Sequence, residues 1–92
     1  MIARNWRCRI GELDLVLARG DVLVVCEVKT RRSSRFGGGY EAVTARKRAK
    51  LRSVAEAFLV SSRRRPGSVR FDVASVSANG RRYDVELFED AF

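Results

Sequence analysis

The chain has 92 residues, of which 19 are Lys or Arg and 11 are Asp or Glu, so its formal charge is +8. This length allows one domain, and 46% hydrophobic residues with a single proline are typical of a chain that folds. Histidine is absent, which excludes Ser-His-Asp and Cys-His nucleophiles and histidine-ligated metals. Chemistry in a domain of residues 1–92 must therefore use carboxylates, lysines or arginines.

Two cysteines, Cys8 and Cys26, are too few for a disulfide scaffold or a closed zinc site. No apolar run approaches the roughly 18 residues of a membrane span, and the first residues lack the order of a signal peptide. We therefore expect a reducing, cytoplasmic setting and no membrane partner.

The positive charge is concentrated in one quarter of the chain. Nine basic residues lie between positions 29 and 52 against one acid, Glu41, whereas the rest of the chain is neutral. Arginine outnumbers lysine by 16 to 3, which favours bidentate phosphate contacts. The pattern predicts a nucleic-acid partner, although an arginine-rich genome is an alternative source of such residues. The expected contacts are Arg31, Arg32, Arg35, Lys47, Arg48 and Arg52.

The first third of the chain reads as three strands. Residues 2–7 and 12–18 have strand patterns, the second with clean alternation. A turn follows at 19–21, and residues 22–30 are β-branched and apolar until Glu27, as in a strand buried on both faces. The sequence predicts a central strand that carries a glutamate and a lysine.

One helix and two further strands are expected after that. Residues 31–40, with glycines at 37–39, form a basic loop that lacks the G-K-[ST] of a P-loop and is better explained as a flap. Thr44 is the expected N-cap of a helix to about Val60. Its apolar stripe is Leu51, Val54, Ala55, Phe58 and Leu59. Residues 69–76 and 83–88 are the last strands.

Acidic residues are predicted to meet beneath this basic region. If 12–18 and 22–30 form a hairpin across Arg19-Gly20, Glu12 lies opposite Glu27 and Asp14 opposite Val25. Alternation then brings Glu12, Asp14, Glu27 and Lys29 to one side of the sheet, unless a bulge breaks the register. Such carboxylates beside a lysine favour a divalent cation, above all magnesium.

The helix contributes to the same place. Extending its apolar stripe backwards reaches Lys47 in the first turn, so this lysine is expected to overhang the carboxylates. Arg48 lies on the other shoulder of the stripe, and both side chains are expected to meet a phosphate there.

Several segments together resemble the YraN-like family of bacterial proteins. They are ARNWR at 3–7, GELD at 11–14, EVKTR at 27–31, AVT at 42–44 with Lys47, VRFDV at 69–73 and EDAF at 89–92. That family is similar to archaeal Holliday-junction resolvases and to the PD-(D/E)xK nucleases. The resemblance implies an α/β fold with a restriction-endonuclease-like mixed central sheet and one main helix, in the order strand, strand, strand, helix, strand, strand.

The resemblance also implies a magnesium-dependent or manganese-dependent endonuclease that acts on branched or structured nucleic acid, with DNA favoured over RNA. Asp14 and Glu27 would be the metal-binding acids, the carbonyl of Val28 a third ligand, and Lys29 the catalytic lysine. One or two metal ions would lower the pKa of a water and neutralise phosphate charge. Glu12 would bind a second metal or order the first.

Relatives in this group carry a helix before the first strand, whereas this sequence starts within that strand. We therefore expect one uncovered sheet face, which predicts marginal stability or pairing with another subunit, such as a homodimer. Two alternatives stay open: a non-catalytic nucleic-acid module, perhaps for RNA, and a structural subunit. Trp6 is expected either in the core or stacked on a base.

Overall fold

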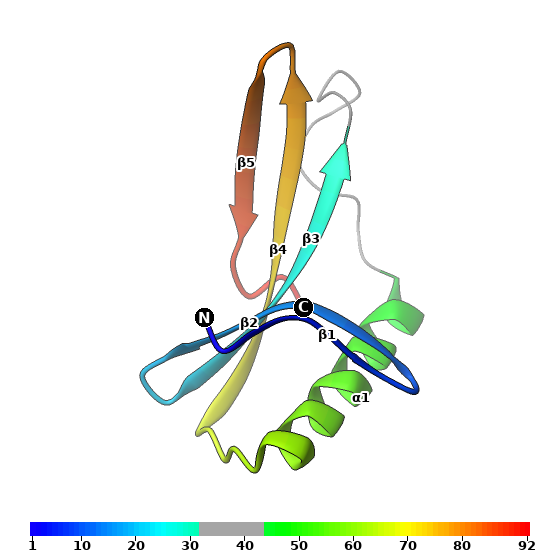
Figure 1. Ribbon diagram of the computed structural model, residues 1–92, viewed down its shortest axis with the longest axis vertical. Coiled ribbons are helices and arrows are strands. Elements are labelled where there is room, and N and C mark those ends of the chain that lie inside the picture. Colours follow the sequence, from blue (N-terminus) through cyan, green and yellow to red (C-terminus); the bar gives the residue numbers. More distant parts are fainter. Residues whose placement is uncertain (32–43) are drawn as a thin grey trace.

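The computed structural model describes residues 1–31 and 44–92 and contains five strands and one helix in that part of the chain (Figure 1). The elements are β1 (Ala3–Cys8), β2 (Gly11–Arg19), β3 (Val22–Arg31), α1 (Ala45–Ser62), β4 (Ser68–Asn79) and β5 (Arg82–Phe88). The predicted order and the single main helix are confirmed, with shifts of a few residues at strand ends. α1 is not apolar enough to cross a membrane.

The strands form one mixed sheet in the order β1-β2-β3-β4-β5. β3 and β4 are parallel, from Val22↔Ser68 to Arg31↔Ser77, and the other neighbours are antiparallel. Parallel neighbours need a long connection, and α1 lies in the one between β3 and β4. β3 is therefore an inner strand between β2 and β4, as its apolar sequence predicts.

α1 begins and ends where local residue types allow it. The Thr44 hydroxyl accepts a hydrogen bond from the backbone N–H of Lys47 at 3.2 Å, which confirms the expected N-cap. Arg63 ends the helix with φ 58°. The apolar stripe packs on the sheet, with Val54, Ala55 and Phe58 buried. The ring of Trp6 meets Phe58 edge to face at 5.3 Å, so Trp6 belongs to the core.

β2 bends at Asp14. Leu13 and Val16 are both 0% exposed and belong to the same core beneath α1. Residues three apart in a straight strand point to opposite faces, so β2 must change the face it presents between them. The pairing with β1 is interrupted at the same level, where Asn5 has φ 51° and makes no pair. This bend decides which side chains reach the candidate site.

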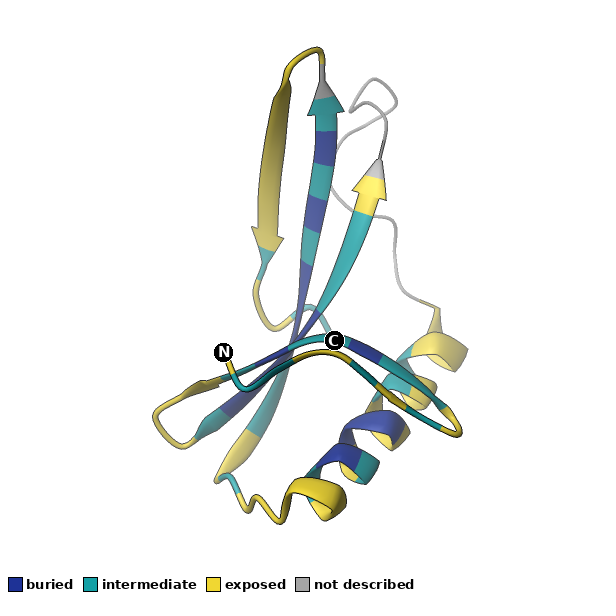
Figure 2. Ribbon diagram, viewed as in Figure 1, coloured by how far each residue is buried: buried dark blue, intermediate teal, exposed yellow. Residues whose placement is uncertain are grey.

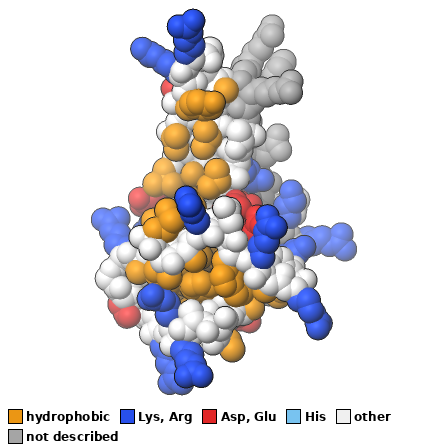
Figure 3. Space-filling model, viewed as in Figure 1, with side chains coloured by type: hydrophobic (Ala, Val, Ile, Leu, Met, Phe, Trp, Pro, Cys, Tyr) orange, Lys and Arg blue, Asp and Glu red, His pale blue; other side chains and the backbone are white. Residues whose placement is uncertain are grey.

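The face of the sheet away from α1 is largely apolar. Leu87 lines a shallow cavity there together with Leu15, Val24 and Cys26. Tyr83 and Val85 alternate with Leu87 along β5 and are 74% and 66% exposed. Figure 2 shows the exposed length of β5, and Figure 3 shows hydrophobic side chains gathered over β4 and β5. A homodimer through this face stays a prediction.

Candidate functional site

Asp14 is fixed by a hydrogen bond to the neighbouring strand. Regular pairing of β2 with β3 ends at Leu15↔Cys26. One residue further, the backbone N–H of Val28 donates to Asp14 Oδ2 at 2.8 Å. The carboxylate of Asp14 therefore continues the contact between the strands after the paired residues end, and it lies against the segment that carries Glu27 and Lys29.

Glu27 lies beside Asp14 on the same side of the sheet. Burial raises the pKa of Glu27 to about 7, and the charge of Asp14 and a hydrogen bond with it act in the same direction. The ammonium group of Lys29 opposes this rise by favouring the ionised form. Two carboxyl groups thus share a half-buried position and compete for one proton near neutral pH.

The register that brings these acids together differs from the predicted one. The pairs run from Leu15↔Cys26 to Arg19↔Val22, so the two-residue turn is Gly20-Asp21 rather than Arg19-Gly20. Gly20 has φ 60°, the conformation that the first central position of a type II′ turn requires. The predicted pairs of Glu12 with Glu27 and of Asp14 with Val25 are therefore wrong.

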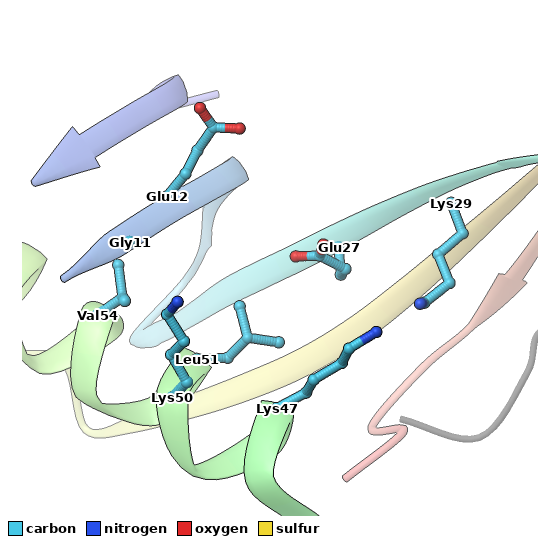
Figure 4. A pocket seen from close by; sticks show the side chains of 8 residues that line it. All are labelled: Gly11, Glu12, Glu27, Lys29, Lys47, Lys50, Leu51 and Val54. Atoms are coloured by element: carbon cyan, nitrogen blue, oxygen red, sulfur yellow. The ribbon is translucent and has the colours of Figure 1, made fainter. Parts of the chain in front are cut away.

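Glu12 does not join the cluster, which corrects the predicted meeting of four charged side chains. It lies opposite Arg7 in the β1–β2 pair, and the two side chains form an ion pair. Figure 4 shows its carboxylate directed away from Glu27. The bend at Asp14 breaks the alternation from which a shared face for Glu12 and Asp14 was predicted.

A pocket of about 230 Å³ lies between the sheet and α1 at this point (Figure 4). Lys29 reaches it from β3, two residues after Glu27 and on the same face. Lys47 reaches it from the first turn of α1, in the position that the helical stripe predicts. Its lining consists of Gly11, Glu12, Glu27, Lys29, Lys47, Lys50, Leu51 and Val54.

Arg48 and Arg52 lie against the C-terminal residues. The guanidinium of Arg48 is 5.8 Å from the centre of the Phe92 ring, and that of Arg52 is 5.7 Å from the centres of both Phe92 and Phe71. Phe92 in turn stacks on Phe71 at 5.1 Å. Neither arginine lines the lysine pocket, so their predicted phosphate contacts belong to a neighbouring surface.

The remaining predicted contacts cannot be placed. Arg32, Arg35 and the glycines at 37–39 lie outside the described residues, and so does the side chain of Arg31. Arg31 itself ends β3, two residues after Lys29.

The donor set suits an oxygen-loving cation. The N–H of Val28 points towards Asp14, and in an extended strand the carbonyl of the same residue points to the same edge. Two carboxylates and one carbonyl therefore face one place, and such ligands suit magnesium or manganese. In residues 1–31 and 44–92 no group of three His, Cys, Asp or Glu side chains is arranged to hold a metal.

Two residues of the pocket were not predicted. Lys50 follows Lys47 by three positions, so the helical periodicity that placed Lys47 also predicts Lys50 on that side. Gly11 allows β2 to approach α1, because a Cβ there would lie 2.8 Å from Val54 Cγ2. Such a close approach between distant segments has no local sequence signal.

The fold and the site together define a small α/β protein with a mixed sheet, two adjoining carboxyl groups and a lysine-lined pocket beneath its one described helix. The family model of uncharacterised protein family UPF0102 matches residues 1–76. The chain belongs to this family, and the YraN-like resemblance of its motifs is confirmed.

Curated relatives support the same assignment. A UPF0102 protein of Frankia alni is 56% identical over 77 residues, which cover 84% of this chain and 64% of that protein. One of Ectopseudomonas mendocina is 51% identical over 81 residues, or 87% of this chain and 68% of the relative. One of Stutzerimonas stutzeri is 42% identical over 93 residues, which cover 100% of this chain and 78% of the relative. The chain therefore spans just under two thirds of the length of some relatives.

Proposed function

We propose that the protein is a metal-dependent endonuclease that hydrolyses phosphodiesters of branched or structured DNA. The observation that carries the proposal is the meeting of Asp14 and Glu27, from adjacent strands, beside Lys29. The hydrogen bond from Val28 to Asp14 and the raised pKa of Glu27 both report this closeness. Paired carboxylates with a lysine are an arrangement suited to phosphodiester hydrolysis that needs no histidine.

Asp14, Glu27 and the carbonyl of Val28 would hold Mg²⁺ or Mn²⁺. When bound, the cation would supply a Lewis acid that neutralises charge on the phosphate under attack. Its binding requires both carboxyl groups to be ionised, so the proton that Glu27 retains near pH 7 would leave.

Lys29 would stabilise the reacting phosphate. Its ammonium group lies close enough to Glu27 to lower the pKa of that carboxyl, and it faces the pocket. In hydrolysis, the oxygen of a water forms a bond to phosphorus, the bond from phosphorus to one sugar oxygen breaks, and a water proton passes to the departing oxygen. The Lys29 ammonium would interact with the negative charge that develops on the phosphate oxygens.

Positive charge around the site favours a nucleic-acid substrate. Lys47 and Lys50 line the pocket, and Arg48 and Arg52 lie on the adjoining side of α1. Such residues supply the salt-dependent part of nucleic-acid affinity. Both cysteines are free, which suits a cytoplasmic protein.

The test is cleavage of a four-way DNA junction by the purified chain with Mg²⁺ or Mn²⁺. We expect Glu27→Ala and Lys29→Ala to abolish cleavage and to leave junction affinity nearly intact. Asp84→Ala, an exposed carboxylate on β5, is the matched control and should cleave normally. Absence of cleavage in the parent chain, or cleavage that survives Glu27→Ala, would contradict the proposal.

A non-catalytic nucleic-acid module is the second candidate. It is favoured by the absence of a third metal-ligating side chain from the described residues around Asp14 and Glu27. This candidate predicts junction or RNA binding whose salt dependence flattens by about one log unit per contact when Arg48 or Arg52 is replaced, without cleavage by any variant.

A further inference from the structure

All three lysines of the chain line one pocket. The sequence uses arginine 16 times and lysine three times, and Lys29, Lys47 and Lys50 together form the cationic wall beside Glu27. No arginine of the described residues lines this pocket. A sequence that places arginine elsewhere thus has lysine wherever a cation reaches this cavity.

The three ammonium groups lack partners in the part of the chain that the structure describes. None of them forms an ion pair with a described carboxylate, and the nearby Glu12 is already paired with Arg7. Lys47 and Lys50 are like charges three residues apart near the N-terminal end of α1, where the helix dipole disfavours cations. Their arrangement costs stability in the free protein, and an anion in the pocket would remove that cost.

The pocket has two cationic sides and an apolar floor. Lys29 stands on β3 beside Glu27, whereas Lys47 and Lys50 reach in from α1 (Figure 4). The floor between them is formed by Gly11, Leu51 and Val54. Charge at two edges and apolar surface between them match a sugar with a phosphate on each side.

We propose that Lys47 and Lys50 form a second phosphate subsite, which binds the phosphate one nucleotide away from the phosphate under attack. The inference rests on the proposed function, because Lys29 and the carboxylates define the first position. The ligand class is a nucleotide unit that carries phosphates on both its 5′ and 3′ oxygens, with its sugar against the apolar floor.

Lysine suits this subsite better than arginine. An ammonium group is a compact charge with three donors on a flexible stem, whereas a guanidinium is a broad planar fork. The aliphatic part of Lys50 lies at Gly11, where even an added Cβ would come within 3.3 Å of Lys50 Cε. A cavity of about 230 Å³ with this contact leaves more room for phosphate beside the smaller group.

The test is calorimetric titration in EDTA with thymidine 3′,5′-bisphosphate and with the two thymidine monophosphates. We expect the parent chain to bind the bisphosphate about tenfold more tightly than either monophosphate. Lys50→Met should lower bisphosphate affinity about three- to tenfold, as expected for one lost charge-assisted contact, and change monophosphate affinity less. Arg65→Met removes the same charge from an exposed position beyond the other end of α1 and should change neither.

Three outcomes would overturn the subsite. They are no binding of the bisphosphate, equal affinity for bisphosphate and monophosphates in the parent chain, and equal losses in Lys50→Met and Arg65→Met. Lys47→Met provides a second variant should Lys50→Met fold poorly. Because the titration contains no metal and needs no cleavage, a chain that binds as expected but never cleaves DNA contradicts only the proposed function.

Discussion

The backbone N–H of Val28 donates to Asp14 Oδ2 at 2.8 Å, one residue beyond the last pair of β2 and β3. The same carboxylate raises the pKa of Glu27. Asp14 therefore serves two purposes: it joins two strands where their pairing ends, and it brings a negative charge to the candidate metal position. Substitutions can separate these purposes, because one depends on a hydrogen-bond acceptor and the other on charge.

Asp14→Ala should destabilise the protein by about 1 to 3 kcal/mol, because the half-buried N–H of Val28 loses its acceptor. Asp14→Asn keeps an acceptor oxygen and should cost less, while it removes the charge that a cation needs. Urea unfolding in EDTA measures both changes. Equal losses in the two variants would show that charge, and not the hydrogen bond, makes the contribution of Asp14 to stability.

The stability of the metal-free protein should fall as the pH rises from about 4.5 to 7. The pKa of Glu27 is raised from 4.5 to about 7, so the folded state holds a proton that the unfolded chain has released in this range. The resulting stabilisation is complete below pH 4.5 and is lost as the pH passes 7. Its size is about 2 to 3 kcal/mol, read from denaturant midpoints at several pH values.

Glu27→Gln is the control for this pH dependence. The variant cannot ionise, so its stability should stay nearly level between pH 5 and 7 and exceed that of the parent chain at pH 7.5. The chain has no histidine, so no other side chain has an ordinary pKa in that range. A slope that survives in Glu27→Gln would locate the titration elsewhere.

Magnesium affinity should rise with pH up to about 7 and then level off. A cation must displace the proton of Glu27, so each pH unit below its pKa of about 7 should weaken binding about tenfold. Calorimetry in buffers of different ionisation enthalpy should detect one released proton at pH 6. Binding that is independent of pH between 5.5 and 7 would show that Glu27 is not a ligand.

Local residue types predicted the elements well because each depends on its neighbours in sequence. Thr44, the apolar stripe and the following Arg-Pro-Gly segment determine α1 without help from the sheet. The register of β2 and β3 depends instead on which turn position Gly20 takes. The predicted and observed registers differ by two residues, and a shift of two keeps every side chain on its face. Asp14 and Glu27 were therefore assigned to the same side despite the wrong pairs.

The errors arise where distant segments meet. The bend at Asp14 moves Glu12 to Arg7, and its only local trace is an asparagine that tolerates φ 51° in β1. The contacts of Arg48 and Arg52 with Phe92 depend on the path of the chain after β5, which no helical pattern encodes. Parity along a strand is predictable from sequence, whereas bends and returning tails need the assembled structure.

Phe92→Ala should lower the free energy of unfolding by about 1 to 3 kcal/mol. The ring stacks on Phe71 and lies under two guanidinium groups, and the adjoining N–H of Ala91 donates to the carbonyl of Phe71 at 2.7 Å. Phe92→Leu keeps apolar area without the aromatic face and should recover part of the loss. Thermal melts at two salt concentrations measure both, and unchanged stability in Phe92→Ala would mean that the C-terminal contacts contribute nothing.

Gly11→Ala should destabilise the protein by about 1 to 3 kcal/mol, because the new methyl group would lie 2.8 Å from Val54 Cγ2. Val54 is 1% exposed, so it cannot move away without disturbing the core. Val54→Ala alone leaves a cavity, but in the Gly11→Ala background it makes room for the added methyl group. The double variant should therefore lose about 1 kcal/mol less than the two single losses combined, as measured by urea unfolding of all four proteins. Strictly additive losses would show that β2 and α1 can separate freely at this contact, and the floor assigned to the lysine pocket would then lack a fixed shape.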